Sequence, residues 1–442
     1  NYQSKAILFK ELTVSNDLYI SDNALLDVND TANFKLTVKG NFIIEDTNSE
    51  YLSRQNTTVF SGNNSGKKIL NKNRNTQLRF YNLEINKLGN NNFDSTLYFG
   101  ALGIPSNYTN NSPLLIDNNF TLQNGTFSVD SSYNFSLKGN LINNGKIITP
   151  QGRCILNGSS NQKISMLDIE NCIMSSIELN NSNGASLLSD FSSRITLTQG
   201  SLFIDKHLLV TDTIILGNSF GVNKMVYSNG LITDRGVKYN INNWGIGIYT
   251  IPIGVLSKYT PFKFVISSGN TGSNEYLNVL GIKGEHKGVS QSSKSLDYYW
   301  NIETSSFGGS TASVTYLFNF YNSDVKGTSS NYQPSKLILG QTSWALEAKG
   351  NISFVDSILL FNEPSGNLGF KSGDFTMGEP SAFSNSIPAY YSIKSGNWND
   401  NTIWSNISHT GDESSTIPNA ASIVYIGTGH TVSLTQNNIT VS

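Results

Sequence analysis

An internal repeat in the first half of the chain restricts its fold more than any other sequence feature. Four short motifs return in one order, roughly 100 residues later. The recurring segments are Thr13–Asp22 with Thr121–Asp130 and Thr196–Asp205, Asn33–Phe42 with Asn134–Leu141, Phe60–Ile69 with Leu156–Ile164, and Asn82–Asn86 with Ser176–Asn180. Chance rarely reproduces an ordered set of motifs, so this region is predicted to consist of stacked copies of one structural unit.

Each copy of the repeat contains short alternating strands, about four to six residues long, separated by Asn-Gly, Gly-Asn or Asn-Asn pairs. Such a strand cannot bury its apolar face alone, and coiling the chain so that each strand lies parallel on the previous one solves this. Asn and Gly suit the corners because both accept left-handed backbone angles, and Asn side chains can pair from turn to turn. We therefore predict a parallel β-helix over residues 1–218, right-handed by the crossover rule. An antiparallel sandwich is the competing interpretation.

The composition favours an all-β, extracytoplasmic protein. Only 14% of the 442 residues are charged, whereas ordinary soluble domains have about 25%. The 20 Tyr and 23 Phe favour strands. With 30 basic and 32 acidic side chains the net charge is −2, so the overall charge gives no basis for binding nucleic acid or an anionic membrane. No apolar run approaches the roughly 18 residues of a membrane span.

The pattern changes after the repeat. Residues 219–385 contain longer alternating strands, such as Tyr276–Ile282 and Ala312–Tyr321, with Gly and Ser turns between them. This alternation predicts an antiparallel β-sandwich. Residues 386–442 are expected to begin a further β-helical module. The chain starts just before one strand-like run and stops within another, so we expect it to be cut from a longer protein, and its lack of a signal peptide says nothing about export.

Several structural motifs resemble those of one protein family. They are Tyr249–Gly254, Tyr259–Phe262, Leu296–Ile302, Phe320–Asp324 and Phe375–Gly378 in the middle region, and Ser395–Trp404, Ile417-Pro418 and Val424–Val432 in the last. The chain resembles giant repetitive cell-surface adhesins of Bacteroidota that are exported by type IX secretion, among them gliding-motility adhesins. The resemblance implies an extracellular protein on the surface of a Gram-negative bacterium. Its implied partners are the outer-membrane secretion machinery, neighbouring modules of the same chain, and glycans or solid surfaces.

Candidate catalytic residues are few. None of the four His residues has a partner at metal-ligand spacing, and the usual enzyme motifs are absent from the sequence. We therefore predict a non-enzymatic segment without catalytic, cofactor-binding or metal-binding residues. The alternative is a polysaccharide lyase or glycosidase with its site on an outer face of the β-helix. Its candidate acids are Glu45, Asp46, Glu84, Asp190 and Asp205, although Glu84 and Glu178 are equally explained as outward residues of repeated strands.

Two side-chain groups could bind a glycan, and each has a structural explanation that we favour. The basic cluster of Lys67, Lys68, Lys72, Arg74 and Arg79 could contact an anionic glycan, but a solvated outer face of the coil explains it better. The tryptophans could form a sugar-stacking platform, but in a sandwich they are more often core residues. These are Trp244, Trp300 and Trp344, with Trp398 and Trp404 expected to pack in the last module.

Two covalent features are also predicted. Cys154 and Cys172 are 18 residues apart, close to one β-helix turn, and are expected on consecutive turns. A disulfide and a pair of buried thiols both remain open. The family resemblance further implies O-glycosylation at Asp-Ser or Asp-Thr pairs, which fall at Thr31, Ser95, Thr213 and Ser357. Common turn chemistry explains such pairs too. Solvent access should be best at Thr31 and Ser95 and worst at Thr213.

Overall fold

The computed structural model describes residues 4–73, 76–89, 95–100, 113–130, 133–170, 172–211, 215–305, 311–363, 372–384, 388–419 and 422–435. The expected all-β class is confirmed, because these residues form strands joined by turns and a few short 3-10 helices, without an α-helix. None of their helices is long and apolar enough to cross a membrane. The chain divides into two compact units: Asn1–Ser228 with Arg235–Asn240, and Asn229–Asp234 with Ile241–Ser442.

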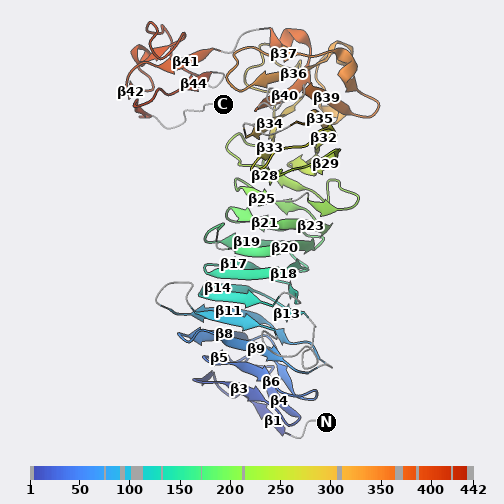
Figure 1. Ribbon diagram of the computed structural model, residues 1–442, viewed down its shortest axis with the longest axis vertical. Coiled ribbons are helices and arrows are strands. Elements are labelled where there is room, and N and C mark those ends of the chain that lie inside the picture. The colour runs from blue at the N-terminus through green and yellow to red at the C-terminus, as the bar shows by residue number, and fades with distance from the viewer. Residues whose placement is uncertain are drawn as a thin grey trace. The chain divides into compact units, whose positions relative to one another are not determined.

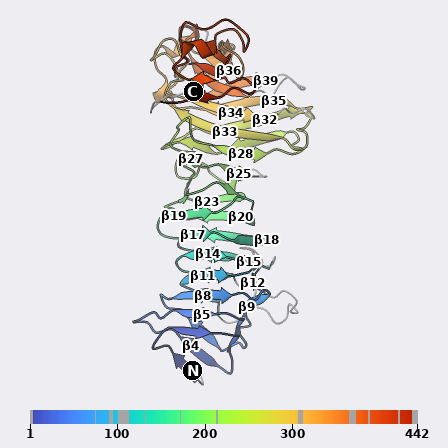
Figure 2. The same cartoon turned by 90° about the vertical axis from the view of Figure 1, so that its left-hand side faces the viewer.

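The first unit is a parallel β-helix, seen as the blue-to-green stack in Figures 1 and 2. Its strands pair in parallel with the strand one turn of the coil away, which gives three strand ladders. The first ladder is β2 (Leu12–Val14), β5 (Leu36–Val38), β8 (Thr57–Gly62), β11 (Asn82–Lys87), β14 (Phe120–Asn124), β17 (Leu141–Asn143), β19 (Gln162–Met166), β21 (Ala185–Leu187), β24 (Leu202–Phe203) and β27 (Val226–Ser228). The predicted β-helix is thereby confirmed, while its handedness stays a prediction.

The other two ladders share two long strands. The second contains β3 (Leu18–Ile20), β6 (Phe42–Ile44), β9 (Lys67–Asn71), β12 (Thr96–Phe99), β15 (Thr126–Val129) and the starts of β18 (Lys146–Leu156) and β20 (Cys172–Asn180). β22 (Phe191–Ser192), β25 (Leu209–Thr211) and β28 (Val237–Asn240) pair in parallel with one another in a separate sheet. The third contains β10 (Arg79–Phe80), β13 (Leu114–Ile116), β16 (Phe135–Leu137), the ends of β18 and β20, β23 (Arg194–Gln199) and β26 (Leu216–Gly217). Below it, β1 (Ser4–Ile7), β4 (Ala24–Asp27) and β7 (Glu50–Leu52) form a separate three-stranded parallel sheet. Parallel pairing thus continues past residue 218, to Asn240.

Inward side chains from all three ladders fill the centre of the coil. Phe42, Phe60 and Phe80 come from different ladders, and their ring centroids lie 5.8–6.0 Å apart. Along one ladder Leu83, Phe120 and Leu141 occupy register positions on successive turns, and all three are fully buried or nearly so. Burial of these stacked side chains supplies the main driving force for the fold, as the alternation in the sequence predicts.

Asn and Gly form the corners between ladders. The Asn119 side chain accepts a hydrogen bond from the Asn140 backbone N–H (2.8 Å), and Asn140 accepts one from Lys163 N–H (2.8 Å). Asn side chains also pair directly between turns, since Asn124 donates to Asn86 Oδ1 at 2.9 Å, which confirms the predicted pairing. Gly139, which precedes Asn140, is required because a Cβ there would lie 2.4 Å from the backbone of Asn118 on the previous turn.

The second unit contains the expected antiparallel sandwich. One sheet holds β33 (Tyr276–Lys283), β34 (Tyr298–Thr304), β40 (Gly373–Gly378), β36 (Gln333–Ile338) and β37 (Ala345–Leu346); the other holds β29 (Gly247–Ile251), β32 (Phe262–Ser268), β35 (Ser313–Asn319), β39 (Ile358–Glu363) and β38 (Ile352–Ser353). The two sheets meet through aromatic rings: Trp300 lies 4.5 Å from Phe318, and Phe361 lies 5.1 Å from Phe375, centroid to centroid.

The last described strands pair in parallel again. β41 (Ala389–Ser392) pairs with β44 (Ile423–Tyr425), and β42 (Gly396–Asn397) pairs with β45 (Val432–Ser433). The short β43 (Trp404–Ser405) adds antiparallel to β41. This parallel arrangement is the pairing that the beginning of a further β-helix requires.

Candidate functional site

The outer surface of the β-helix carries ion pairs that join adjacent turns. Lys72 lies 2.8 Å from Glu45, and Arg79 lies 2.7 Å from Asp117. Lys67 faces Asp17, two turns away, at 3.4 Å. Three members of the predicted basic cluster are therefore neutralised by carboxylates, which supports a solvated, charge-compensated face over an anion-binding patch. The fourth and fifth members are Lys68, whose backbone N–H bonds the Asn41 side chain, and Arg74, which lies outside the described residues.

The candidate acids of the enzyme interpretation make structural contacts. Glu45 pairs with Lys72, and Asp190 pairs with Arg235 while accepting the Leu208 backbone N–H. Asp46 accepts the Ser49 hydroxyl and backbone N–H at 2.7 Å each. Burial raises the pKa of Asp46, but these hydrogen bonds outweigh it and leave the pKa below its usual value.

The remaining acids also lie at repeated or turn positions. Glu84 sits at a half-buried position of β11, in register with Val59 on the previous turn and Thr121 on the next. Glu178 bonds Arg153 at 3.0 Å and the Thr198 hydroxyl at 2.9 Å. Asp205 occupies a left-handed turn position with φ of 51°. The carboxylates are thus distributed along the coil in fold-supporting roles.

Lys87 is a buried charge that the sequence analysis missed. Its Nζ lies 3.1 Å from the Ser61 carbonyl oxygen and 3.4 Å from that of Lys39, and the residue is 1% exposed. Burial, with a smaller contribution from the charge of Lys67, lowers the pKa of Lys87 to about 8. Its position at the end of an alternating strand resembles that of an ordinary exposed lysine, so the sequence gives no signal of its burial.

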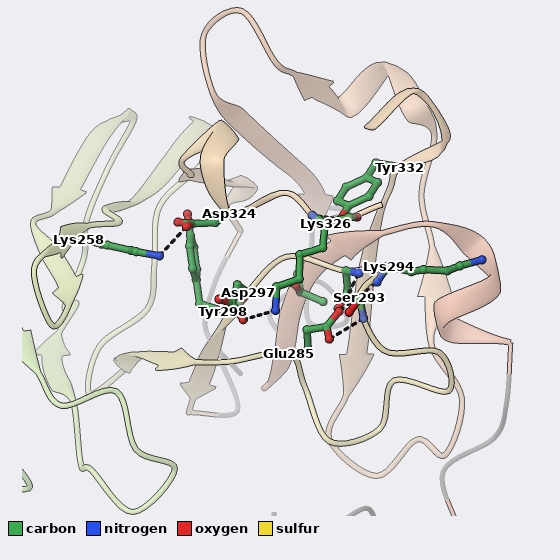
Figure 3. A network of polar contacts seen from close by, with 11 residues as sticks. Lys258, Glu285, Ser293, Lys294, Asp297, Tyr298, Asp324, Lys326 and Tyr332 are labelled. Atoms are coloured by element: carbon green, nitrogen blue, oxygen red, sulfur yellow. Dashed lines mark hydrogen bonds and ion pairs between the residues drawn. The ribbon is translucent and has the colours of Figure 1, made fainter. Parts of the chain in front are cut away.

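A network of charged and polar residues ties together three segments of the second unit (Figure 3). Lys258 pairs with Asp324, and Lys326 donates to Asp297 at 2.7 Å. Glu285 accepts the backbone N–H groups of three consecutive residues. The network joins β31 (Lys258–Tyr259), the loop between β33 and β34, and the loop between β35 and β36.

The electrostatics of this network favour its charged form. Burial pushes the pKa of Glu285 upward, but the N–H groups of Ser293 and Ser295 hold it below its usual value. The hydrogen bond to Asp297 raises the pKa of Lys326. Burial raises the pKa of Tyr298, whose hydroxyl accepts the Tyr321 N–H at 2.9 Å. Each charge already has a partner, so the network is suited to holding loops in place.

Most of the tryptophans lie in the core and not on the surface. Trp300, Trp344, Trp398 and Trp404 are buried. Trp398 and Trp404 contact each other in one cluster with Tyr390 and Ile403. Trp244 is half-buried and stacks on Tyr249 at 4.3 Å. The structure therefore does not bring Trp300 and Trp344 to a sugar-stacking surface.

The two cysteines do not stack as expected. They lie on the paired strands β18 and β20, but Cys154 is opposite Ile177 and Cys172 is opposite Ile147. This register offsets them by five positions, roughly 16 Å at ~3.3 Å per residue, whereas a disulfide needs Cα atoms within ~7 Å. The expectation of consecutive stacking is wrong because this turn takes 23 residues from Cys154 to Ile177, more than the 18 between the cysteines. Cys154 itself is buried.

The four predicted O-glycosylation positions differ in solvent access. Thr31 is exposed, in a turn where its hydroxyl contacts Asn29 Oδ1 at 2.8 Å. Ser95 is 1% exposed, and its hydroxyl lies 2.9 Å from the Leu88 carbonyl oxygen, so its expected solvent access is wrong. Ser357 is half-buried in a left-handed turn. Thr213 lies outside the described residues.

Comparison with known proteins gives no relative for this chain: no family model matches it, and neither the curated proteins nor the solved structures contain a significant match.

Proposed function

We propose that this chain is a non-enzymatic structural and adhesive segment of a large secreted bacterial surface protein. The observation that carries the proposal is the β-helix itself. Successive turns are joined by backbone hydrogen bonds, buried side-chain ladders and outer ion pairs, so each added turn extends the structure by one strand spacing. Such a stack can separate the binding surfaces of a long protein from the point where that protein is anchored.

The sequence resemblance adds the location and the partners to this proposal. The chain would be extracellular, on the surface of a Gram-negative bacterium, and would meet the type IX secretion machinery during export. Its surface would contact glycans or solid surfaces during cell adhesion or gliding, and neighbouring modules of the same protein. The low charge and the compensated outer pairs suit a surface that binds uncharged or weakly charged material.

Binding and hydrolysis assays separate the adhesive function from the enzymatic alternative. The purified chain is incubated with acidic and neutral polysaccharides, and unsaturated and reducing ends are measured. We expect no release above a heat-denatured control. In parallel, retention on glycan arrays and on glass or polystyrene beads is measured, and we expect saturable retention on at least one surface. Turnover of any polysaccharide would overturn the proposal, and retention on none would reduce it to a spacer without a ligand.

A further inference from the structure

One edge strand of the sandwich lacks the features that usually protect an open sheet edge. Edge strands are commonly very short or carry charged side chains, because their unpaired backbone groups could otherwise pair with another chain. Within the described residues, β29, β37 and β38 are edge strands of the two sheets. β37 and β38 have two residues each, whereas β29 has five. No charged side chain occurs from Ile241 to Val255, the segment that contains β29.

The side chains that this edge exposes are aliphatic. Ile246 is 73% exposed, and Ile248 is 68% exposed. Ile248 lies opposite the half-buried Val265 of β32, on the outer face of the sheet. A Cβ added at Gly245 would have no atom within 4 Å, so the start of the strand is open to solvent. The edge thus offers apolar side chains as well as backbone groups to a partner strand.

The hydrogen bonds of the neighbouring residues show which backbone groups of β29 face outward. Thr260 N–H donates to the Ile253 carbonyl at 3.1 Å, and these two residues lie opposite each other when the register of β29 and β32 is extended by two positions. Backbone direction alternates along a strand, so every second residue before Ile253, including Tyr249, faces β32. The N–H and C=O groups of Ile248 and Thr250 therefore face the open side.

A second copy of β29 can pair with these groups. In an antiparallel arrangement with Ile248 on a two-fold axis, Ile248 lies opposite its own equivalent, and Ile246 lies opposite Thr250. Both exposed isoleucines then gain a cross-strand neighbour. With Tyr249 on the axis instead, Ile246 would lie opposite Pro252, which has no N–H to donate. The register centred on Ile248 is therefore the one that we favour.

We propose that the open edge of β29 is a self-association surface, and that its occupant is β29 of a second copy of this chain. The absence of charge is the property that self-pairing needs, because a charged side chain near a two-fold axis would meet its own equivalent. Ile246 and Ile248 of each copy lose exposure to water against the other copy. The same strand contributes both halves of the contact, so the contact closes and gives a dimer. This association is independent of the glycan or surface that the protein binds.

Sedimentation velocity and sedimentation equilibrium of the full chain over a concentration series test the proposal. We expect the average mass to rise from one copy to two copies and no further. Ile248→Lys places two like charges across the axis and should weaken the dimer by a factor of about ten or more. Leu339→Lys is the matched control, because it adds the same charge at a 74% exposed position elsewhere in the second unit, and it should dimerise like the parent chain. Circular dichroism checks that each variant retains its strand content.

A charge-pair experiment tests the two-fold pairing directly. Ile248→Glu alone should be as weakly associated as Ile248→Lys, and an equimolar mixture of the two variants should dimerise, because opposite charges then face each other. Hydrogen exchange of residues 245–251 should slow as the concentration of the parent chain rises. A parent chain that stays monomeric, or that assembles beyond the dimer, would overturn the proposal. Dimers of undiminished strength in Ile248→Lys, or a mixture that stays monomeric, would overturn it too.

Discussion

The β-helix and the sandwich both bury apolar side chains, but they differ in how far apart along the chain their paired strands lie. In the β-helix, paired strands are separated by roughly two dozen residues, as for Leu12 with Leu36. In the sandwich, Trp300 on β34 pairs with Phe375 on β40, far along the chain. A stack with nearest-neighbour contacts gains stability turn by turn, whereas the sandwich needs its distant strands together before its core forms.

This difference predicts separate responses to damage. A lost contact in the β-helix weakens the turns next to it, and a lost contact in the sandwich weakens the whole sandwich. Calorimetry of the full chain should therefore resolve two transitions, one for each compact unit. Substitutions placed in one unit at a time test that expectation.

Truncating the sandwich core should have the largest effect. Trp300 is fully buried, its ring lies 5.2 Å from that of Tyr298, and its indole N–H donates to the Thr260 carbonyl at 3.0 Å. Trp300→Ala is expected to lower the free energy of unfolding of the sandwich by about 3–5 kcal/mol. In calorimetry it should lower the midpoint temperature of the sandwich transition only. Val355→Ala, at a 95% exposed position, is the control and should change neither transition measurably. Equal shifts of both transitions would contradict independent units.

Crowding a corner of the β-helix should have the next largest effect. Gly139→Ala places a Cβ 2.4 Å from the Asn118 backbone, and the expected cost is roughly 1–3 kcal/mol. Gly221→Ala is the matched control in the same unit, since no atom lies within 4 Å of its Cβ position and its φ is not left-handed. Denaturant titration should show a lower free energy of unfolding for Gly139→Ala only. Unchanged stability of Gly139→Ala would mean that the corner is looser than its geometry indicates.

The buried Lys87 should make the β-helix more stable at alkaline pH. Its pKa is about 8 in the folded chain and the usual 10.5 when unfolded. Between these values the unfolded chain binds more protons, so stability rises with pH. Measured from pH 7 to about pH 9, where most tyrosines are still protonated, the gain should be on the order of 1 kcal/mol.

Lys87→Met is the matched variant for this measurement. It lacks the titrating group, so the stability of its β-helix transition should stay flat over the same pH interval. The sandwich transition should behave identically in both proteins. A rise that persists in Lys87→Met would assign the effect to another group.

The sequence predicted features that depend on neighbouring residues in the chain. The alternation of apolar residues and the Asn and Gly corners both follow from local chemistry, and Gly139 with Asn140 lies at a corner as expected. The features it missed depend on how long each turn is. The cysteine register failed because an assumed turn of 18 residues is in fact 23, and turn length is set by loops whose size no strand pattern dictates.

The sequence also did not predict which polar side chains are buried. Ser95 follows a polar segment that looks solvent-exposed, yet its hydroxyl reaches the carbonyls of Asn63 and Leu88. Lys87 fills a space beside Gly125, which has no side chain to occupy it. In both cases the hydrogen-bond acceptor is a backbone carbonyl oxygen. Because every residue has one, the sequence does not indicate which carbonyl will accept the bond.

Acid should weaken the β-helix by a small amount through one ion pair. Arg54 donates two hydrogen bonds to Asp27, at 3.0 and 2.8 Å, and this contact lowers the pKa of Asp27 to about 2 from its usual 3.8. A lowered carboxylate pKa stabilises the fold above pH 3.8, and that contribution is lost as the pH falls through 2. Because Arg54 is partly exposed, solvent screening limits the expected effect to about 1 kcal/mol.

Arg54→Gln tests the acid effect, since it removes the charge that stabilises ionised Asp27. Its β-helix transition should start lower at pH 6 and then fall less steeply between pH 4 and pH 2 than that of the parent chain. Lys35→Gln removes a cation from the more exposed Glu11 pair and should follow the parent curve. An unchanged dependence of stability on pH in Arg54→Gln would contradict this prediction. The remaining contacts of Asp27, from Lys5 and the Asn29 N–H, would then be sufficient to keep its carboxylate ionised.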